Sequence, residues 1–136
     1  MDKNIFKTIL IALLLTSFLP GFKCSKVEDH NIRTSGCIKG KLVAKGPCSQ
    51  YVIQLLSGDT ANADKAANWI DPVTNTNYTN VFTVKNYCYF ADPNVGYEFY
   101  FYLVKELTPM QCNTCTATRA TPSQSNEVQY TGGVCE

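Results

Sequence analysis

The sequence predicts an all-β, mainly antiparallel fold: a small, disulfide-braced barrel or sandwich of five strands with one short helix. Three observations predict it. Once an N-terminal segment of 23 residues is set aside, the 136-residue chain has the size of one ordinary domain. Its apolar residues fall in short runs separated by Gly, Pro and Asn, which is typical of strands joined by turns. Seven cysteines in so short a chain favour a disulfide framework.

Residues 1–23 are predicted to be a secretory signal peptide. Lys3 and Lys7 supply a positive start, and the apolar run TILIALLLTSFL follows at 8–19, before Pro20. A helix needs about 20 apolar residues to span a bilayer, so this run is too short for a membrane anchor. We therefore expect a secreted protein or one of the cell envelope, in the periplasm or on the outer membrane surface.

The segment Cys24-Ser-Lys directly follows the apolar run and resembles the mature start of many bacterial lipoproteins. The resemblance implies that Cys24 is acylated and that the protein contacts a membrane only through this lipid anchor. Gly21 and Lys23 depart from the lipoprotein pattern, which usually has Leu and a small residue at these places. An acylated Cys24 would leave six cysteines, which can all pair; otherwise Cys24 is cleaved away or free.

The folded part is predicted to be a single β domain at 36–136, preceded by a polar, flexible tether at 24–35. Its first strand, GCIKGKLVA at 36–44, alternates apolar and lysine side chains. The turn signal Gly46-Pro47 then predicts a hairpin with QYVIQLL at 50–56. Two further strands are expected in TNVFTVKNYCYF (79–90) and GYEFYFYLV (96–104), which are rich in β-branched and aromatic residues, and a fifth in NEVQYT (126–131).

The one helix is expected in DTANADKAANW, at 59–69, because this stretch is rich in alanine and begins with residues that cap helices. It would be one to three turns long and stable only when packed. The strand number and the domain size allow a five-stranded barrel of the OB type. The usual OB helix falls between the third and fourth strands, whereas this one would fall between the second and third.

The two cysteines of CNTC at 112–115 have a spacing that thiol oxidoreductases, zinc ribbons and disulfide scaffolds share. A thioredoxin-type thiol lies at a helix N-terminus, but Thr, Ser and Pro crowd the following residues. A zinc ribbon needs a second close pair, and the one histidine, His30, lies in the tether. Neither a metal nor another cofactor is expected. We predict structural disulfides among Cys37, Cys48, Cys88, Cys112, Cys115 and Cys135, with Cys112 and Cys115 bonded to different partners and one of them to Cys135.

Charge and motifs exclude several functions. Twelve basic and eleven acidic residues give a net charge of +1, without a basic run, so nucleic acid is not an expected partner. A histidine-dependent hydrolase is disfavoured because the chain has no Gly-x-Ser-x-Gly elbow and its histidine lies in the tether. Asp71 and Asp92 each precede a proline, where aspartate favours turns. We therefore do not expect an enzyme.

The strand at 96–104 offers the one candidate binding face. Alternation places Tyr100 and Tyr102 opposite the face that holds Phe99 and Phe101. The two tyrosines either pack beneath the long segment 105–125 or present their rings to a ligand. The function we expect is a non-catalytic module that binds a partner protein or glycan. The alternatives are an inhibitor-like domain whose disulfide-braced loop blocks an enzyme cleft, and a thiol-disulfide oxidoreductase that uses Cys112 and Cys115.

Overall fold

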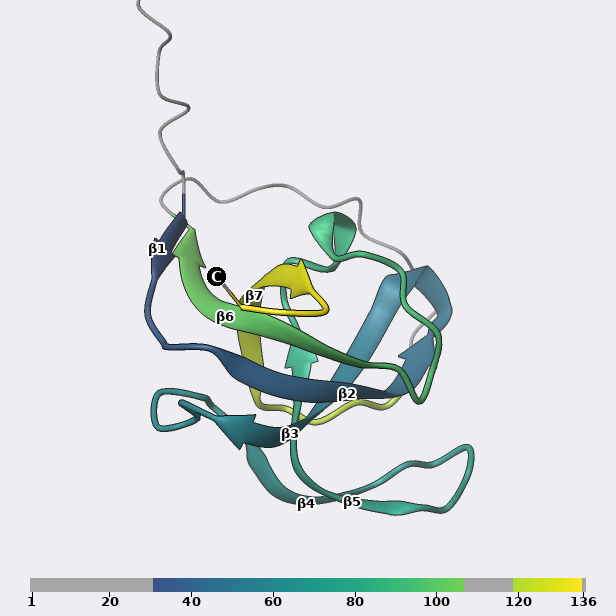
Figure 1. The fold of residues 1–136 in the computed structure, drawn as a ribbon. Helices are drawn as coiled ribbons and strands as arrows, with labels where there is room; N and C mark the ends of the chain where they lie inside the picture. The colour runs from purple at the N-terminus through teal and green to yellow at the C-terminus, as the bar shows by residue number, and fades with distance from the viewer. Residues whose placement is uncertain (1–30, 107–118, 136) are drawn as a thin grey trace, which may run out of the picture.

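Seven strands form one sheet in the computed structural model, which describes residues 31–106 and 119–135 (Figure 1). The predicted all-β, mainly antiparallel class is confirmed, since only one pair of strands runs parallel in the described part. The strands are β1 (Asn31–Arg33), β2 (Ile38–Gly46), β3 (Gln50–Gly58), β4 (Ala66–Ile70), β5 (Asn77–Val84), β6 (Glu98–Glu106) and β7 (Ser125–Gly132).

Five of these strands close into a ring. β2 pairs with β3 on one side and β6 on the other, and β3 continues to β5. β7 completes the ring because it pairs antiparallel with β6 and parallel with β5. A ring of five strands is consistent with the five-stranded, partly open barrel of the OB type that the sequence allows. The remaining strands, β1 and β4, extend the sheet outside the ring.

The β2–β3 hairpin follows its predicted course. The two strands pair antiparallel from Ile38↔Gly58 to Gly46↔Gln50. At the turn, Cys48 and Ser49 both have positive φ, of 59° and 58°. Short hairpin loops use left-handed residues because such turns match the twist of the flanking strands. The turn thus takes its shape without a glycine at either position.

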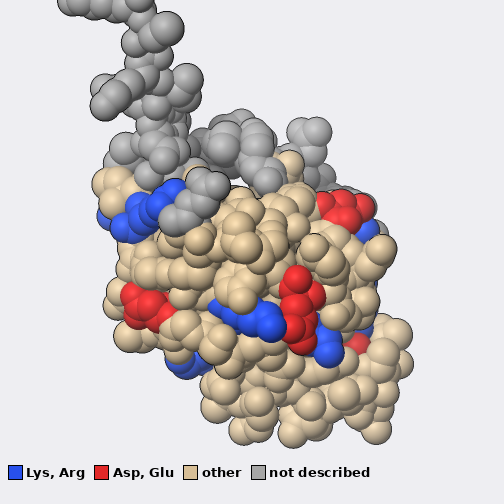
Figure 2. Space-filling model, in the orientation of Figure 1, with Lys and Arg blue, Asp and Glu red and all other residues tan. Residues whose placement is uncertain are grey.

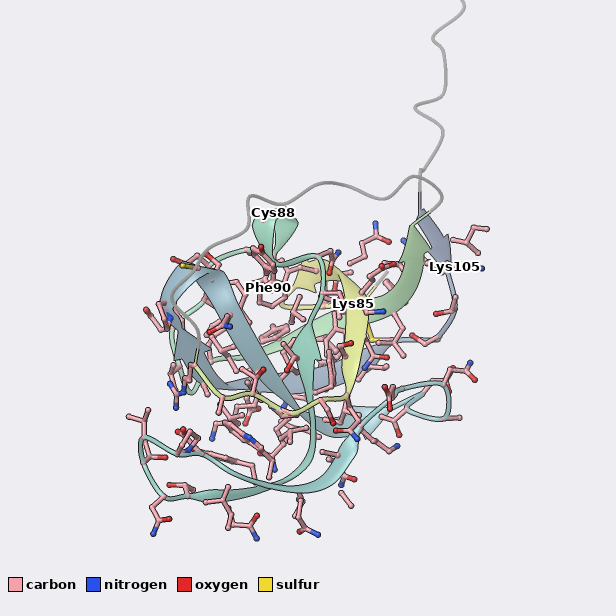
Figure 3. All side chains as sticks on the ribbon, turned by 180° about the vertical axis from the view of Figure 1, so that it is seen from behind. Lys85, Cys88, Phe90 and Lys105 are labelled. Atoms are coloured by element: carbon pink, nitrogen blue, oxygen red, sulfur yellow. A yellow bond between two sulfur atoms is a disulfide. The ribbon has the colours of Figure 1, made fainter. Side chains whose placement is uncertain are left out.

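The inside of the ring holds the main apolar core. Alternation along β6 directs Phe99, Phe101 and Leu103 into it, as predicted. Phe90, which follows the short 3-10 turn η3 (Tyr87–Tyr89), also points into the ring (Figure 3). The buried core residues are Ile38, Leu42, Tyr51, Ile53, Leu55, Phe82, Val84, Phe90, Phe99, Phe101, Leu103 and Val128.

The predicted helix at 59–69 is wrong. This stretch is an irregular loop that leads into strand β4, which pairs with β5 from Ala66↔Val81 to Ile70↔Asn77. Alanine propensity is a weak preference that tertiary contacts override. Here Trp69 stacks on Tyr78 across the two strands, with ring centroids 6.2 Å apart, and the pair packs on a second buried apolar cluster. Within the described ranges, the helical segments are the 3-10 turns η2 (Pro47–Ser49) and η3; η3 falls where the OB helix is usual.

The folded part also begins earlier than Gly36. β1 pairs with β6, with Ile32 opposite Lys105, so residues 31–33 belong to the sheet and not to a tether. The predicted signal peptide and Cys24 lie outside the described residues, and so do Cys112 and Cys115. In the part of the chain that the structure describes, no helix has the length and apolarity to cross a bilayer.

A disulfide joins Cys37, just before β2, to Cys135, just after β7. The predicted bond between Cys135 and either Cys112 or Cys115 is therefore wrong. The reason is the sheet order: Ile38 and Tyr130 are both register partners of Phe101, which brings the start of β2 and the end of β7 together. Cys48 and Cys88 are disulfide-bonded as well, in agreement with the predicted structural bridges.

Candidate functional site

A cavity of about 280 Å³ opens at one end of the ring, beside the loop that connects η3 to β6. Its lining residues are Ala91, Asp92, Pro93, Asn94, Tyr97 and Tyr130. Five of them belong to the loop, and Tyr130 is contributed by β7. Mouths of small β rings are common places for ligand sites, because loops and strand ends converge there.

Backbone hydrogen bonds fix the loop against β2. The Gly96 N–H donates to the carbonyl of Leu42 at 2.7 Å, and the Leu42 N–H donates to the carbonyl of Tyr97 at 3.0 Å. A third bond, from the Tyr97 N–H to the Asn94 carbonyl, closes a turn. Gly96 has a φ of +93°, which a residue with a side chain adopts only at a cost. The loop therefore holds its side chains in a defined arrangement before any ligand arrives.

Two tyrosines form the aromatic wall of the cavity. Tyr97 is 49% exposed and its ring lies parallel to the buried ring of Phe99, with 11° between the planes and 6.4 Å between centroids. Tyr130 packs edge-on against Phe90, 5.8 Å away. Burial raises the pKa of Tyr130, and the neighbouring Tyr97 raises it further. The Tyr130 hydroxyl is thus protonated at neutral pH.

Asp92 supplies a charged acceptor at the rim. Its Oδ1 accepts a hydrogen bond of 2.9 Å from the Tyr51 hydroxyl and forms an ion pair with Lys45 Nζ. The hydrogen bond from Lys45 holds the pKa of Asp92 below its ordinary value, and the bond from Tyr51 lowers it further. Asp92 is therefore ionised and oriented at neutral pH, while most of its side chain stays exposed.

A buried ion pair on another part of the molecule was missed by sequence reasoning. Asp71 is only 1% exposed and accepts hydrogen bonds from the Val73 N–H, the Thr74 hydroxyl and the Arg119 guanidinium. The first two bonds form the aspartate turn that the sequence predicts. Burial raises the pKa of Asp71, but the hydrogen bonds from Arg119, Val73 and Thr74 outweigh it and leave the pKa below its ordinary value.

Arg119 connects three segments of the chain. Besides Asp71, it contacts the end of β2 by donating from Nη1 to the Lys45 carbonyl at 3.0 Å. Its backbone N–H donates to Gln50 Oε1 at 2.7 Å, at the start of β3. Nη1 and Nη2 are thus committed to protein partners, while the buried Nε has none among the described residues, and we assign this pair a structural role.

The predicted face of Tyr100 and Tyr102 lies elsewhere, on the outer side of β6. Tyr102 is only 6% exposed, and the guanidinium carbon of Arg33 lies 4.1 Å from its ring centroid. Tyr100 is half-buried. The two rings therefore do not form an open platform, and a ligand-binding role for them stays a prediction.

The surface charge is sparse and mixed. Figure 2 shows a mostly uncharged face on which basic and acidic side chains lie beside one another. The ion pair between Lys39 and Glu98, at 2.7 Å, is one such contact. Within 31–106 and 119–135, no group of three or more His, Cys, Asp or Glu side chains is placed to hold a metal ion.

The chain matches no protein-family model, no curated protein and no solved structure.

Proposed function

We propose that this protein is a non-catalytic binding module, secreted or anchored in the cell envelope, that takes one neutral sugar residue of a glycan in the cavity of Asp92, Asn94, Tyr97 and Tyr130. One observation carries the proposal: a half-exposed tyrosine ring, backed by a buried phenylalanine, lies beside an oriented carboxylate. This combination matches the two chemical surfaces of a sugar.

Tyr97 supplies the aromatic surface for the sugar. The C–H face of a pyranose is apolar and stacks on aromatic rings, which contribute both buried area and a specific geometry. Because Tyr97 already stacks on Phe99, little side-chain freedom is lost when a second ring covers its exposed face. The cavity volume is just below the usual range of about 300–1,000 Å³ for ligand sites and suits one sugar ring better than a long chain.

Asp92 and Asn94 supply the polar groups for the sugar hydroxyls. Sugar hydroxyls are donors, and a carboxylate accepts from them more strongly than a neutral group does. The ion pair with Lys45 and the Tyr51 hydroxyl bond hold Oδ1 in place, so a ligand meets an oriented acceptor. Asn94 adds an amide that can both donate and accept. Because Lys45 neutralises the charge of Asp92, the rim carries no net charge and suits a neutral sugar.

The proposed location follows from cysteine chemistry. The Cys37–Cys135 bond, together with bonded Cys48 and Cys88, supports an oxidising compartment, since disulfides persist there and are rare in the cytosol. Acylation at Cys24 is a separate proposal. If it is right, Cys24→Ser should release the protein from the detergent phase into the aqueous phase. A mature N-terminus without lipid would contradict it.

The glycan proposal is tested by NMR titration with methyl glycosides of glucose, galactose, mannose and N-acetylglucosamine. At least one of them should shift the backbone amides of Asn94, Tyr97 and Tyr130 in a saturable way. Tyr97→Ala should weaken that binding about 5- to 150-fold, the range found for one stacked ring in nucleic-acid sites. Tyr97→Phe should keep it, because the ring remains.

Tyr100→Ala is the matched control, since Tyr100 is a half-buried tyrosine on the outer face of β6, the strand that begins directly after Tyr97. If Tyr100→Ala abolishes sugar binding while Tyr97→Ala leaves it intact, the site belongs to the outer face of β6 and the proposal is wrong. Absence of saturable shifts with all four sugars also contradicts it.

A further inference from the structure

A second cavity, of about 260 Å³, lies on the outer face of β6 and is lined by Arg33, Tyr102, Thr131 and Val134. These residues come from β1, β6, the end of β7 and the segment after it. The Cys37–Cys135 bond ties that last segment to the start of β2. The cavity shares no lining residue with the proposed sugar site.

Arg33 gives this cavity a fixed positive charge. Its guanidinium stacks on the Tyr102 ring at 4.1 Å, and Tyr102 is itself buried. A guanidinium that stacks on an aromatic ring keeps its N–H groups in its own plane, parallel to the ring, where they can still donate to a ligand. Among the described residues, the ion pairs are formed by Lys39, Lys45 and Arg119, and none includes Arg33. The guanidinium of Arg33 is thus held in place, and none of these ion pairs neutralises its charge.

The other two lining residues restrict the ligand. The Thr131 hydroxyl donates its proton to the Tyr100 carbonyl at 2.9 Å, so towards the cavity Thr131 Oγ1 is an acceptor. A ligand that meets both residues needs an anionic acceptor for Arg33, such as a carboxylate, and a hydrogen-bond donor for Thr131, such as an N–H group. Val134 is 66% exposed and adds an apolar surface. A carboxylate, an adjacent N–H and an apolar side chain together describe the C-terminal residue of a peptide.

The charged side chains around the cavity favour a ligand with a single negative charge. The register Arg33↔Val104↔Glu127 places the Glu127 carboxylate on the same face, two strands from Arg33. Lys105 is the register partner of Ile32 and therefore belongs to the opposite face. One guanidinium with a carboxylate nearby suits a monoanion better than a phosphate dianion. The planar fork of arginine also matches a carboxylate in a bidentate way.

We infer that this cavity binds the free C-terminal carboxylate of a peptide that ends in an apolar residue, with Arg33 on the carboxylate, Thr131 on the terminal amide N–H and Val134 against the side chain. The site is independent of the proposed sugar site. The protein would then hold a protein terminus and a sugar on different surfaces.

The test uses N-acetyl-leucine as the probe and N-acetyl-leucine amide as its neutral isostere, in NMR titrations of the intact domain. N-acetyl-leucine should shift the amides of Arg33, Thr131 and Val134 in a saturable way, and the amide should bind at least 10-fold more weakly. Arg33→Gln should abolish binding of the carboxylate. Arg33→Lys should weaken it several-fold, because a lysine keeps the charge but loses the fork.

Two controls distinguish loss of binding at this site from loss of folding and from effects at the sugar site. The spectrum of Arg33→Gln away from the cavity should match the parent spectrum, which shows that the domain is folded. Tyr97→Ala should leave N-acetyl-leucine binding unchanged. The inference is overturned if the neutral amide binds as well as the acid, if binding survives Arg33→Gln, or if inorganic phosphate binds more tightly than N-acetyl-leucine.

Discussion

The buried Asp71–Arg119 pair should be one of the most sensitive polar contacts of the domain. Asp71→Ala removes the carboxylate that accepts from Arg119, Val73 and Thr74. The Arg119 side chain is only 14% exposed and would retain the Lys45 carbonyl as its partner on Nη1. The change therefore leaves a largely buried cation without a countercharge.

Breaking a buried ion pair from one side costs about 3–5 kcal/mol, much of it the penalty of the unpaired charge. A domain has only about 5–15 kcal/mol of stability in total. With an m-value of about 1.5 kcal/mol/M, the urea midpoint should fall by roughly 2–3 M. Replacing both partners, as Asp71→Leu with Arg119→Met, should recover a large part of the loss because no charge stays buried.

Urea unfolding followed by far-UV circular dichroism measures these values. The matched control is Glu98→Ala, which also removes one carboxylate from an ion pair. Its pair with Lys39 is at the surface, with side chains 46% and 35% exposed, so the change should lower the free energy of unfolding far less than Asp71→Ala does. If Asp71→Ala costs no more than Glu98→Ala, our assignment of a structural role to the buried pair is refuted.

Four further predictions concern pH, backbone and disulfides. The folded-state pKa of Asp71 is lowered. Its contribution to stability is therefore present above the unfolded pKa of about 4 and is lost as the pH falls through the folded pKa. In acid denaturation monitored by fluorescence, Asp71→Asn should lose less stability below about pH 4 than the parent protein does. Gly58 has a φ of +103°, and a Cβ there would lie 2.2 Å from the Cys37 carbonyl oxygen. Gly58→Ala should therefore cost roughly 2–4 kcal/mol in urea unfolding. An unchanged midpoint would contradict the close contact between Gly58 and the Cys37 carbonyl. Replacing Cys37 and Cys135 together by Ser should cost about 2–5 kcal/mol, because their bond closes a long loop; a loss of under 1 kcal/mol in thermal unfolding would contradict this. Thiol titration of the denatured, unreduced protein should find none of the four described cysteines free, and labelling of any one of them would count against the disulfide framework.

Local patterns predicted the parts of the fold that depend on neighbouring residues. Alternation along β6 correctly separated Phe99 and Phe101 from Tyr100 and Tyr102, and Gly46-Pro47 correctly marked the β2–β3 turn. The failure at 59–69 has a physical reason: alanine favours a helix, but Trp69 gains more by packing with Tyr78 across β4 and β5.

Features that need ring closure were beyond sequence reasoning. The partner of Cys135 depends on β2 and β7 both lying beside β6, which no local pattern reveals. The same holds for the candidate sugar site, where Tyr130 of β7 meets Asp92 and Tyr97 of a distant loop. Tyr97 is exposed and Tyr102 is buried because different segments cover the two rings. Alternation along a strand predicts only which face of the sheet a side chain is on. Asp92 before Pro93 predicted a turn but not the role of that turn in a cavity.

The position of the Cys37–Cys135 bond determines how the domain responds to mechanical force. The bond encloses residues 37–135, so nearly the entire ring lies inside one covalent loop. Tension applied between the two chain ends passes through the sulfur atoms and leaves the strands unloaded, apart from the short β1. A domain closed in this way can be pulled at its ends without being stretched. Force applied through a ligand at the Tyr97 cavity, in contrast, enters inside the loop and is resisted by the hydrogen bonds between β2 and the adjoining loop.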